Sequence, residues 1–386
     1  MSRVLVYIDS LKAGGAERVA LQFASWLEQA GHQPLLLTRR SPAVDFYPVP
    51  ASLERLVEPP EPRWLRRLGW AGFPLRLLRL RRFLVRQGLD LAVVLTTLPA
   101  IKLSLAAWGL GLPVVVSERN YPPAKPLSRP WRCLRRLTYP RAALHLVQTE
   151  GIAAWLRERG LARRTAVLAN AITWPLPRFE PHLEPSAWVE DEQRLVLAVG
   201  TKADQKGFDW LVQAFAAQVE HQPAWRLAIL GITAEPYHGI DQVQQLLAVL
   251  PEGHPARGRI VFPGRAGNVA DWYARADLFV LSSRYEGFPN VLLEAMASGV
   301  ACLALDCPTG PADLVRNGEN GMLVPLHPSA LAEGLASLMA DAPRRSRLGQ
   351  QAREVRRRFS PEGQRRLFLD ALAPWLQGTP PQEEPC

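Results

Sequence analysis

Short apolar runs alternate along the chain with longer amphipathic segments and with turns rich in glycine and proline. Such runs are typical of strands that a parallel sheet buries on both faces, and the spacing of apolar positions between them is typical of helices. The pattern therefore predicts α/β domains built on parallel sheets. The predicted strands are 4–8, 34–38, 91–95, 114–116, 144–148, 166–172, 195–200, 227–231, 260–265, 278–281, 300–305 and 323–325.

The length and composition predict two domains. The chain has 386 residues, of which 48% are apolar, so it can bury more core than one domain usually holds. Prolines gather near the middle of the chain, and we take 176–192 as a linker. The linker separates an N-terminal domain, 1–175, from a C-terminal domain, 193–358.

The segment 282–299 joins a predicted strand to a short predicted helix through a tight polar loop. We expect the helix to span 291–298, with Asn290 as its cap and Gly299 as its end. The first backbone N–H groups of such a helix, near 290–292, lack partners within the helix, and the helix dipole adds positive charge there. The junction therefore predicts an anion site.

Two carboxylates flank this predicted anion site, Glu286 in the loop and Glu294 one turn into the helix. A carboxylate next to a phosphate is costly unless it binds another group, and sugar or ribose hydroxyls are suitable donors to it. Phosphate together with two hydroxyl-binding acids indicates a nucleotide sugar. The alternative is a surface loop followed by a capped amphipathic helix without a ligand.

The sequence from Glu286 to Ala295 resembles the Glu-x7-Glu signature of the retaining, GT-B-fold glycosyltransferases of family 4. The resemblance extends over nearly the whole chain. It implies that Glu286 lies at the donor sugar and acts in catalysis, and that Glu294 holds the ribose. It also implies that one stretch of backbone lines the sugar and diphosphate, namely Gly287, Phe288, Pro289, Asn290 and Val291.

The same resemblance implies the architecture. The expected fold class is α/β, GT-B, with two Rossmann-like domains facing across a cleft: an acceptor-side N-terminal domain and a C-terminal domain that binds the nucleotide sugar. Ser360 and Pro361 are typical of a helix start. In this architecture the helix 360–377 packs back onto the N-terminal domain, and 378–386 is expected to be a flexible tail.

The segment 200–207 is similar to the Gly-Arg-…-Lys-Gly pattern of the family, in which an arginine and a lysine bind the diphosphate. Lys206 matches the lysine and is expected to be catalytic, whereas Thr201 stands at the arginine position with Lys202 next to it. A lysine neutralises phosphate but cannot make the two parallel hydrogen bonds of an arginine. Lys202 is expected either to serve as the second cation or to point into solvent.

Three further loops resemble donor-binding parts of the family. Gly14 and Gly15 follow the first predicted strand, like a family loop that faces the donor phosphates. Arg265 stands where relatives hold the nucleotide base. Gly310, in the loop Cys-Pro-Thr-Gly-Pro, can present an amide to phosphate, and this loop looks like those of members that build bacterial surface glycans.

The acceptor side is less defined by the sequence. Glu118, Arg119 and Asn120 follow a predicted strand, and ligands of parallel sheets bind at the carboxyl ends of strands, so these residues are expected to line the acceptor site. The alternative is a structural Glu118–Arg119 pair. His145 adjoins a separate strand and is expected to be structural.

The net charge of +10 is concentrated, because eight arginines and no acid lie between 63 and 86. The predicted helix 74–87 is amphipathic, with Leu77, Leu80 and Leu84 on one stripe. Such a helix, preceded by tryptophans, can lie on an anionic membrane surface. The alternative is an ordinary helix packed on the strand 91–95. The expected basic stripe is Arg76, Arg79, Arg82 and Arg86.

Other classes of protein are disfavoured. Prolines and glycines interrupt the apolar region 91–116 at strand spacing, which argues against a transmembrane span. No nucleic-acid-binding module is recognisable. The four cysteines lack metal-ligand spacing, and 4–8 is too short for a signal peptide. A cytoplasmic location is expected, peripheral to the inner face of the plasma membrane.

The predicted reaction is transfer of a glycosyl group from a nucleoside diphosphate sugar, UDP-hexose or UDP-N-acetylhexosamine, to a hydroxyl of a saccharide or lipid-linked saccharide. Retention is implied by the resemblance. No Asp-x-Asp occurs in the sequence, so we expect neither a metal nor another cofactor. The alternatives are a GT-B sugar-nucleotide epimerase and a noncatalytic module that binds saccharide or membrane.

Overall fold

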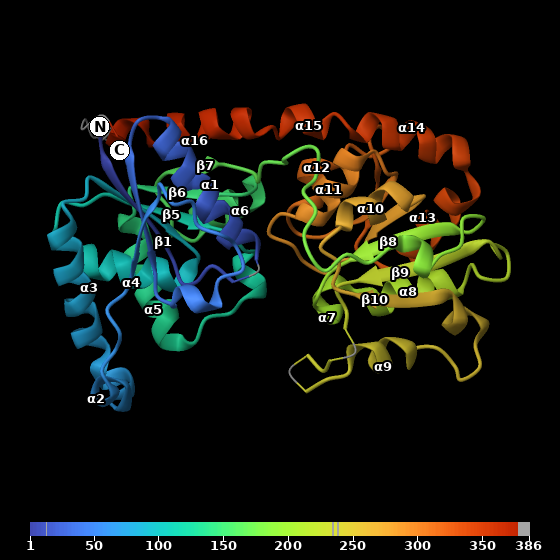
Figure 1. Ribbon diagram of the computed structural model, residues 1–386, viewed down its shortest axis with the longest axis horizontal. Coiled ribbons are helices and arrows are strands. Elements are labelled where there is room, and N and C mark those ends of the chain that lie inside the picture. Colours follow the sequence, from blue (N-terminus) through green and yellow to red (C-terminus); the bar gives the residue numbers. More distant parts are fainter. Residues whose placement is uncertain (13, 234, 238, 377–386) are drawn as a thin grey trace. The chain divides into compact units, whose positions relative to one another are not determined.

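The chain forms two compact α/β units in the computed structural model, which describes residues 1–12, 14–233, 235–237 and 239–376 (Figure 1). The first unit comprises residues 1–170 together with the C-terminal segment from Glu362, and the second comprises 171–361. The predicted tail, 378–386, lies outside the described residues.

The first unit is built on a seven-stranded, fully parallel sheet with the order β3-β2-β1-β4-β5-β6-β7. Every predicted strand of this region is present, because each apolar run is covered by helices on both faces. A further strand, β3, lies in the proline-rich segment 41–62. The strands are β1 (Arg3–Ile8), β2 (Gln33–Thr38), β3 (Glu54–Val57), β4 (Leu91–Leu95), β5 (Val114–Glu118), β6 (Leu144–Val147) and β7 (Thr165–Val167).

The helices of this unit include the predicted basic helix, α3 (Phe73–Gln87), whose Leu80 and Leu84 are buried as expected. The last helix, α16 (Pro361–Leu376), belongs here too: Phe368 stacks on Phe23 of α1 with 4.3 Å between ring centroids. The others are α1 (Gly15–Gln29), η1 (Pro42–Val44), α2 (Arg63–Arg67), η2 (Gly69–Gly72), α4 (Thr97–Ala107), η3 (Pro122–Ala124), α5 (Arg129–Thr138), η4 (Tyr139–Arg141) and α6 (Glu150–Glu158).

The second unit contains a six-stranded, fully parallel sheet with the order β10-β9-β8-β11-β12-β13. All its strands fall within a few residues of the predicted ones. They are β8 (Arg194–Val199), β9 (Trp225–Leu230), β10 (Ile260–Gly264), β11 (Leu278–Leu281), β12 (Cys302–Asp306) and β13 (Met322–Pro325).

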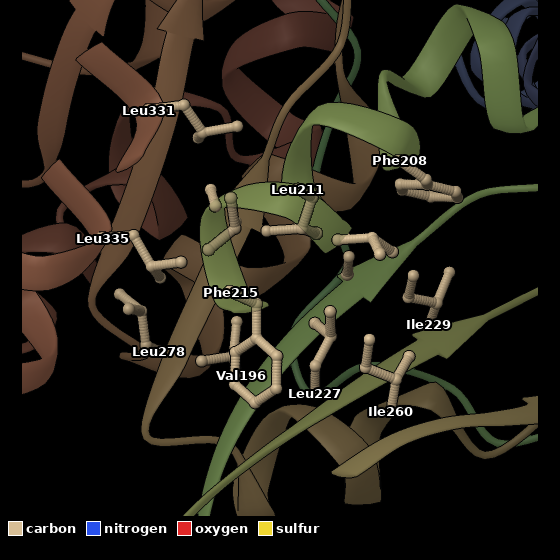
Figure 2. Packing of buried hydrophobic residues seen from close by; sticks show 14 of the residues in the cluster. Val196, Phe208, Leu211, Phe215, Leu227, Ile229, Ile260, Leu278, Leu331 and Leu335 are labelled. Carbon is tan, nitrogen blue, oxygen red and sulfur yellow. The ribbon is translucent and has the colours of Figure 1, made fainter. Parts of the chain in front are cut away.

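Helices of the second unit pack their apolar faces on this sheet. Figure 2 shows Phe215 of α8 lying against Val196 of β8, with Phe208 of α8 and Leu331 and Leu335 of α13 in the same cluster. The helices are η5 (Pro185–Ala187), α7 (Ala203–Lys206), α8 (Phe208–Ala216), α9 (Gln242–Leu247), η6 (Pro255–Arg259), α10 (Val269–Arg275), α11 (Asn290–Ser298), α12 (Pro311–Leu314), α13 (Pro328–Ala340), α14 (Ala342–Ala352) and α15 (Val355–Arg358).

The start of α11 corrects one prediction. Asn290 is the first residue of the helix and not its cap, a position that Pro289 takes without a side-chain hydrogen bond. The reason is local: the Asn290 N–H donates to the carbonyl of Phe288 over 3.0 Å, so the chain is already turning at this residue. Gly299 ends the helix as predicted, with a φ of 84°.

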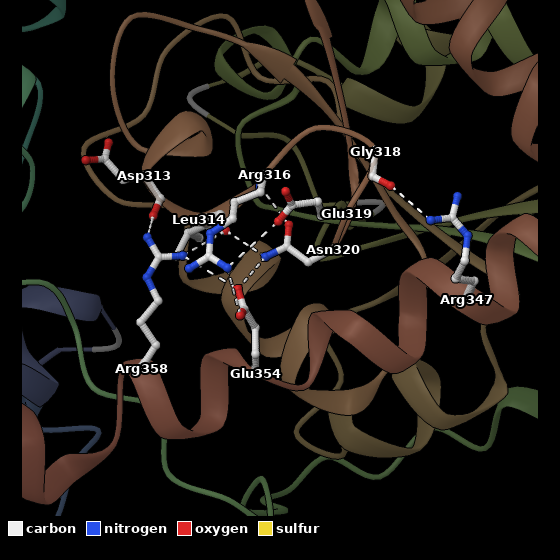
Figure 3. Close-up of polar contacts among 9 residues, drawn as sticks. All are labelled: Asp313, Leu314, Arg316, Gly318, Glu319, Asn320, Arg347, Glu354 and Arg358. Carbon is white, nitrogen blue, oxygen red and sulfur yellow. Dashed lines mark hydrogen bonds and ion pairs between the residues drawn. The ribbon is translucent and has the colours of Figure 1, made fainter.

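The loop between β12 and β13 is held by the helices that follow it (Figure 3). The Glu354 carboxylate accepts hydrogen bonds from Arg316 Nη1 at 3.1 Å and from Asn320 Nδ2 at 2.9 Å. Asn320 Oδ1 in turn accepts the Arg316 N–H at 2.7 Å, and Arg358 donates to the Leu314 carbonyl at 3.3 Å. These contacts fix the position of the loop that carries Gly310.

Both sheets change winding direction at one point, between β1 and β4 in the first unit and between β8 and β11 in the second. In such sheets the connections on either side of that point diverge and leave a crevice beyond the carboxyl ends of the two strands, where ligands bind. None of the described helices has the length and apolarity needed to cross a membrane.

Candidate functional site

The two predicted catalytic residues meet where the second sheet reverses its winding. Lys206 ends α7, just after β8, and Glu286 lies in the loop after β11, the strand paired with β8. Lys206 Nζ donates to Glu286 Oε1 over 2.7 Å, and the two side chains are only 15% and 8% exposed. Residues 80 positions apart therefore form one partly desolvated ion pair at the place where this topology binds ligands.

One oxygen of Glu286 is occupied by protein donors. Ser283 Oγ donates to Oε1 over 2.6 Å, in addition to Lys206. The backbone carbonyl of Glu286 accepts a hydrogen bond from the Thr309 hydroxyl, which ties this loop to the one after β12. Among the described residues no hydrogen-bond partner is found for Oε2, so this oxygen is left to accept a hydroxyl of a ligand.

Glycines allow the loops to approach one another. Gly207 has a φ of +60°, and a Cβ there would lie 2.1 Å from the carbonyl oxygen of Ser282. A Cβ at Gly310, whose φ is +99°, would lie 2.5 Å from Cδ of Pro289. Larger residues cannot occupy these positions without moving the backbone. The loops after β8, β11 and β12 consequently converge on Glu286.

The start of α11 offers fewer free N–H groups than the sequence predicts. The Asn290 N–H donates to Phe288 and the Leu292 N–H to Pro289, both at 3.0 Å. The Val291 N–H has no backbone acceptor among the described residues. The positive end of the helix dipole still faces this loop, which Gly287, Phe288 and Pro289 form.

Glu294 lies on α11, where it is partly exposed, and has a neighbour that the sequence did not indicate. The hydroxyl of Tyr273 on α10 is 3.3 Å from Glu294 Oε2 and 3.1 Å from the Val291 carbonyl oxygen. Tyr273 is fully buried, so its ring fixes the hydroxyl beneath the start of α11. No sequence motif marks Tyr273 as a site residue.

The second predicted cation is exposed. Lys202 precedes α7, and the structure describes no acceptor for its ammonium group. The backbone around it is fixed by the buried Gln242, whose Oε1 accepts the Ala203 N–H at 2.8 Å and whose Nε2 donates to the Thr201 carbonyl at 3.3 Å. Gln242 lies 40 residues away in the sequence, which explains why no local pattern identifies it.

Two other predicted donor contacts belong to other elements of the fold. Arg265 is exposed and follows β10, an edge strand two positions from β8. Gly14 and Gly15 stand at the start of α1 in the first unit, next to the point where that sheet reverses. Their roles in binding a donor stay predictions.

The predicted acceptor residues separate in the structure. Glu118 is fully buried and accepts hydrogen bonds from Thr97 Oγ1 at 3.1 Å and from the Tyr139 hydroxyl at 2.9 Å, and burial raises its pKa. Arg119 instead donates to Asn170, and burial lowers the pKa of its guanidinium to about 9. The two residues therefore do not form the alternative structural pair with each other.

Asn120 is the most accessible of the three predicted acceptor residues. Its Oδ1 accepts a hydrogen bond from Lys125 Nζ at 2.5 Å, and the side chain is partly exposed. The enclosure of Glu118 favours a structural role for that carboxylate, because it leaves no surface for an acceptor to contact.

Comparisons with known proteins agree with this fold. Residues 13–173 match the domain described as Glycosyltransferase Family 4, and residues 193–341 match the one described as Glycosyl transferases group 1. The solved structure of HepE from Anabaena in complex with UDP and glucose has a TM-score of 0.76 over 97% of this chain and 100% of its own, at 19% identity. At that identity the likeness shows the fold alone.

Curated relatives match over very different shares of their length. The amylovoran biosynthesis glycosyltransferase AmsD of Erwinia amylovora is 25% identical over 94% of this chain and 97% of its own. An exopolysaccharide phosphotransferase of Streptomyces coelicolor is 29% identical over 70% of this chain, which spans only 27% of that protein. Two other relatives are matched over 35% and 49% of their length.

The fold and the two domain matches point the same way. Both parallel sheets have Rossmann-like strand order, and the solved structures that resemble the chain are GT-B glycosyltransferases. Each unit matches its own glycosyltransferase domain, one after the other along the sequence. The chain therefore belongs to the family 4 type of glycosyltransferases.

Proposed function

We propose that the chain transfers a sugar from a nucleoside diphosphate sugar to an acceptor hydroxyl with retention of configuration. The observation that carries this proposal is the Lys206–Glu286 pair at the reversal point of the second sheet, next to the start of α11. It places one cation, one carboxylate with an unoccupied oxygen and a helix dipole within a single group of loops.

Each group has a distinct part in this reaction. Lys206 keeps N–H groups beyond the one that binds Glu286, and these would neutralise the leaving diphosphate. Glu286 Oε2 would accept a hydroxyl of the donor sugar, and Glu294 would accept those of the ribose. Because the pair is partly desolvated, its electrostatic effect on the diphosphate is stronger than in water. We expect no metal to be required.

Relatives support a choice of donor and pathway. Similar solved structures contain UDP and glucose or UDP-glucose by their titles, and relatives are named for synthesis of amylovoran and of lipopolysaccharide core. We therefore infer a UDP-hexose or UDP-N-acetylhexosamine donor, and a saccharide or lipid-linked saccharide acceptor of a bacterial cell-surface glycan.

We also infer that the first unit contacts an anionic membrane surface through α3. Leu75, Leu78 and Val85 are exposed on this helix together with Arg82 and Arg86. Apolar side chains and arginines on one exposed face are what a helix lying on anionic lipid needs. The exposed basic stripe of α3 is shorter than the predicted one, because Arg76, which was predicted to belong to it, turns inward.

Arg76 and Arg79 bind the chain that precedes α3. The Arg76 guanidinium donates to the Glu61 carboxylate, to the Gly69 carbonyl at 2.6 Å and to the Leu65 carbonyl at 2.9 Å. Arg79 donates to the Pro60 carbonyl at 3.1 Å. These two residues are thus less available to lipid than Arg82 and Arg86.

The proposal is tested by incubating the purified chain with UDP-sugars and synthetic alkyl glycosides, and by measuring UDP release and the anomeric configuration of the product. Transfer that retains the configuration, without added metal, is the expected result. Conversion of the UDP-sugar without an acceptor would instead identify an epimerase. Absence of any turnover, with the nucleotide bound, would indicate a noncatalytic module.

A further inference from the structure

A cavity of about 460 Å³ lies in the first unit, far along the sequence from Glu286. Its polar end is formed by Arg39 and Glu58, which directly follow β2 and β3, and by Lys102 of α4. The carboxyl ends of parallel strands are where such sheets bind ligands. The volume is within the range of small-molecule sites.

The polar side chains of this cavity offer hydrogen-bond donors and few free acceptors. Glu58 accepts a hydrogen bond from the Tyr7 hydroxyl, and Glu61 accepts one from Arg76. Four cationic side chains line the cavity against these two carboxylates. An anionic group only accepts hydrogen bonds, whereas a neutral hydroxyl group also donates one and would need a free acceptor. The side chains of this cavity therefore favour a ligand that carries negative charge.

Two of the cations are not paired with a carboxylate in the part of the chain that the structure describes. Lys102 Nζ lies 6.0 Å from the ring centroid of Trp131 and has no hydrogen-bond acceptor there. Arg79 makes one hydrogen bond, to the Pro60 carbonyl. Burial, and then the neighbouring charge of Arg39, lowers the pKa of Lys102, while the carboxylates of Glu58 and Asp9 raise it.

Aromatic side chains also line the cavity. Trp70, Phe73 and Trp131 contact one another with centroid distances of 5.2 to 5.6 Å, which joins η2 and the start of α3 to α5. Trp70 is 52% exposed. A large apolar side chain is normally buried, so its exposure at a cationic cavity indicates a ligand with an apolar part.

We propose that this cavity binds a phosphate or diphosphate group that is attached to an apolar chain. The phosphate lies between Arg79 and Lys102, and the chain leaves along Trp70 and Trp131. The assignment of this compound as the lipid part of the acceptor rests on the proposed transferase function. Its binding in the cavity does not depend on that function and is measured separately.

The test titrates the full chain, in saturating UDP, with farnesyl diphosphate, inorganic diphosphate and farnesol, and follows tryptophan fluorescence. Farnesyl diphosphate should bind at least about tenfold more tightly than either half of the molecule alone. Equal binding of inorganic diphosphate would overturn the apolar part of the proposal, and equal binding of farnesol would overturn the phosphate part.

Matched variants locate the site. Arg79→Gln and Lys102→Gln should each weaken farnesyl diphosphate binding about tenfold or more, the loss expected for one charge-assisted hydrogen bond. Arg163→Gln, at an exposed position of the first unit that does not line the cavity, should leave the affinity within about twofold of that of the parent chain. Equal losses in Arg79→Gln and Arg163→Gln would overturn the assignment to this cavity.

UDP binding, measured on the same variants, separates this proposal from the proposed function. A melting curve of each variant shows that its first unit is folded, which UDP binding to the second unit does not report. If UDP binds and farnesyl diphosphate does not, the cavity assignment is wrong and the transferase proposal stands. If farnesyl diphosphate binds and no nucleotide does, the cavity assignment stands and the donor site is wrong.

Discussion

At the scale of single residues, the two carboxylate oxygens of Glu286 differ: Lys206 and Ser283 donate to Oε1, whereas no donor to Oε2 is found in the described part of the chain. Glu286→Gln keeps an oxygen for Ser283 but removes the negative charge beside Lys206 and a strong acceptor for the sugar. We expect turnover to fall on the order of 100-fold, and UDP affinity to change far less, because the lost contact is to the sugar. Steady-state kinetics and UDP titration measure the two quantities.

Glu333→Gln, an exposed acid on α13, is the matched control and should leave both quantities unchanged. Equal losses of turnover and UDP affinity in Glu286→Gln would show instead that the carboxylate shapes the loop. A melting curve of each variant separates that outcome from unfolding.

His145 differs from Glu286 because it is a titratable residue with a structural role. It is fully buried in β6, both ring nitrogens lack hydrogen-bond partners among the described residues, and burial lowers its pKa to about 4. Between pH 6.5 and 4 the unfolded chain binds a proton there that the folded chain does not. The free energy of unfolding should therefore fall as the pH drops through this window, by about 3 kcal/mol from this residue.

His145→Leu should remove most of that pH dependence, because leucine is similar in size and does not titrate. Urea unfolding at pH 7 and pH 5 measures the effect. His221→Leu, at an exposed position, should keep the pH dependence of the parent chain. If His145→Leu loses as much stability on acidification as the parent, His145 is not the group that titrates.

At the scale of elements, α3 has an exposed face that can be tested directly. An arginine near an anionic lipid surface contributes about 1 kcal/mol, so replacing both Arg82 and Arg86 with Gln should weaken binding to anionic vesicles about 10- to 30-fold at low salt. Vesicle co-sedimentation at several ionic strengths measures this, and the loss should shrink as salt rises.

The matched control replaces two other exposed arginines, Arg357 and Arg366, and so keeps the same net charge. An equal loss in the control would mean that binding follows overall charge and not α3. Unchanged binding in the α3 variant would leave this helix as ordinary scaffold.

The elements could be predicted where local sequence decides them. The strands of both sheets could be predicted, because parallel strands are buried on both faces and appear in the sequence as apolar runs. Strand β3 could not be located from the sequence, since its residues are partly exposed and include Glu54 and Arg55. The inward turn of Arg76 depends on Glu61, which lies 15 residues away, so the spacing along the helix could not show it.

The candidate site could likewise be predicted only where local sequence decides it. Lys206 and Glu286 follow strands that the motifs identify, and their ion pair follows from the pairing of β8 with β11. Tyr273 and Gln242 could not be predicted, because each acts through packing between distant segments. The cavity beside Lys102 could not be predicted either, since its walls come from several separate elements of the first unit.

At the scale of the whole molecule, the sheets of the two units share a strand order, but the two units differ in net charge. The segment 63–86 holds eight arginines and no acid, and 119–149 adds seven cations and no acid. Trp131 of α5 contacts Trp70 and Phe73, so both basic segments lie in the same part of the first unit. Basic residues thus gather on the unit proposed to bind lipid and acceptor, while the residues proposed to bind the donor, Lys206, Glu286 and Glu294, lie in the second unit.

This division predicts which unit a nucleotide stabilises. UDP at about 100 times its dissociation constant should stabilise the second unit by about 2.7 kcal/mol, which hydrogen exchange would show as slower exchange in β8 and β11 and unchanged exchange in β5 to β7. Glu294→Gln should reduce the effect, because it removes the proposed ribose contact, and GDP or ADP should give less if the base is uracil. Slower exchange confined to the first unit would contradict the donor site, since Lys206, Glu286 and Glu294 all lie in the second.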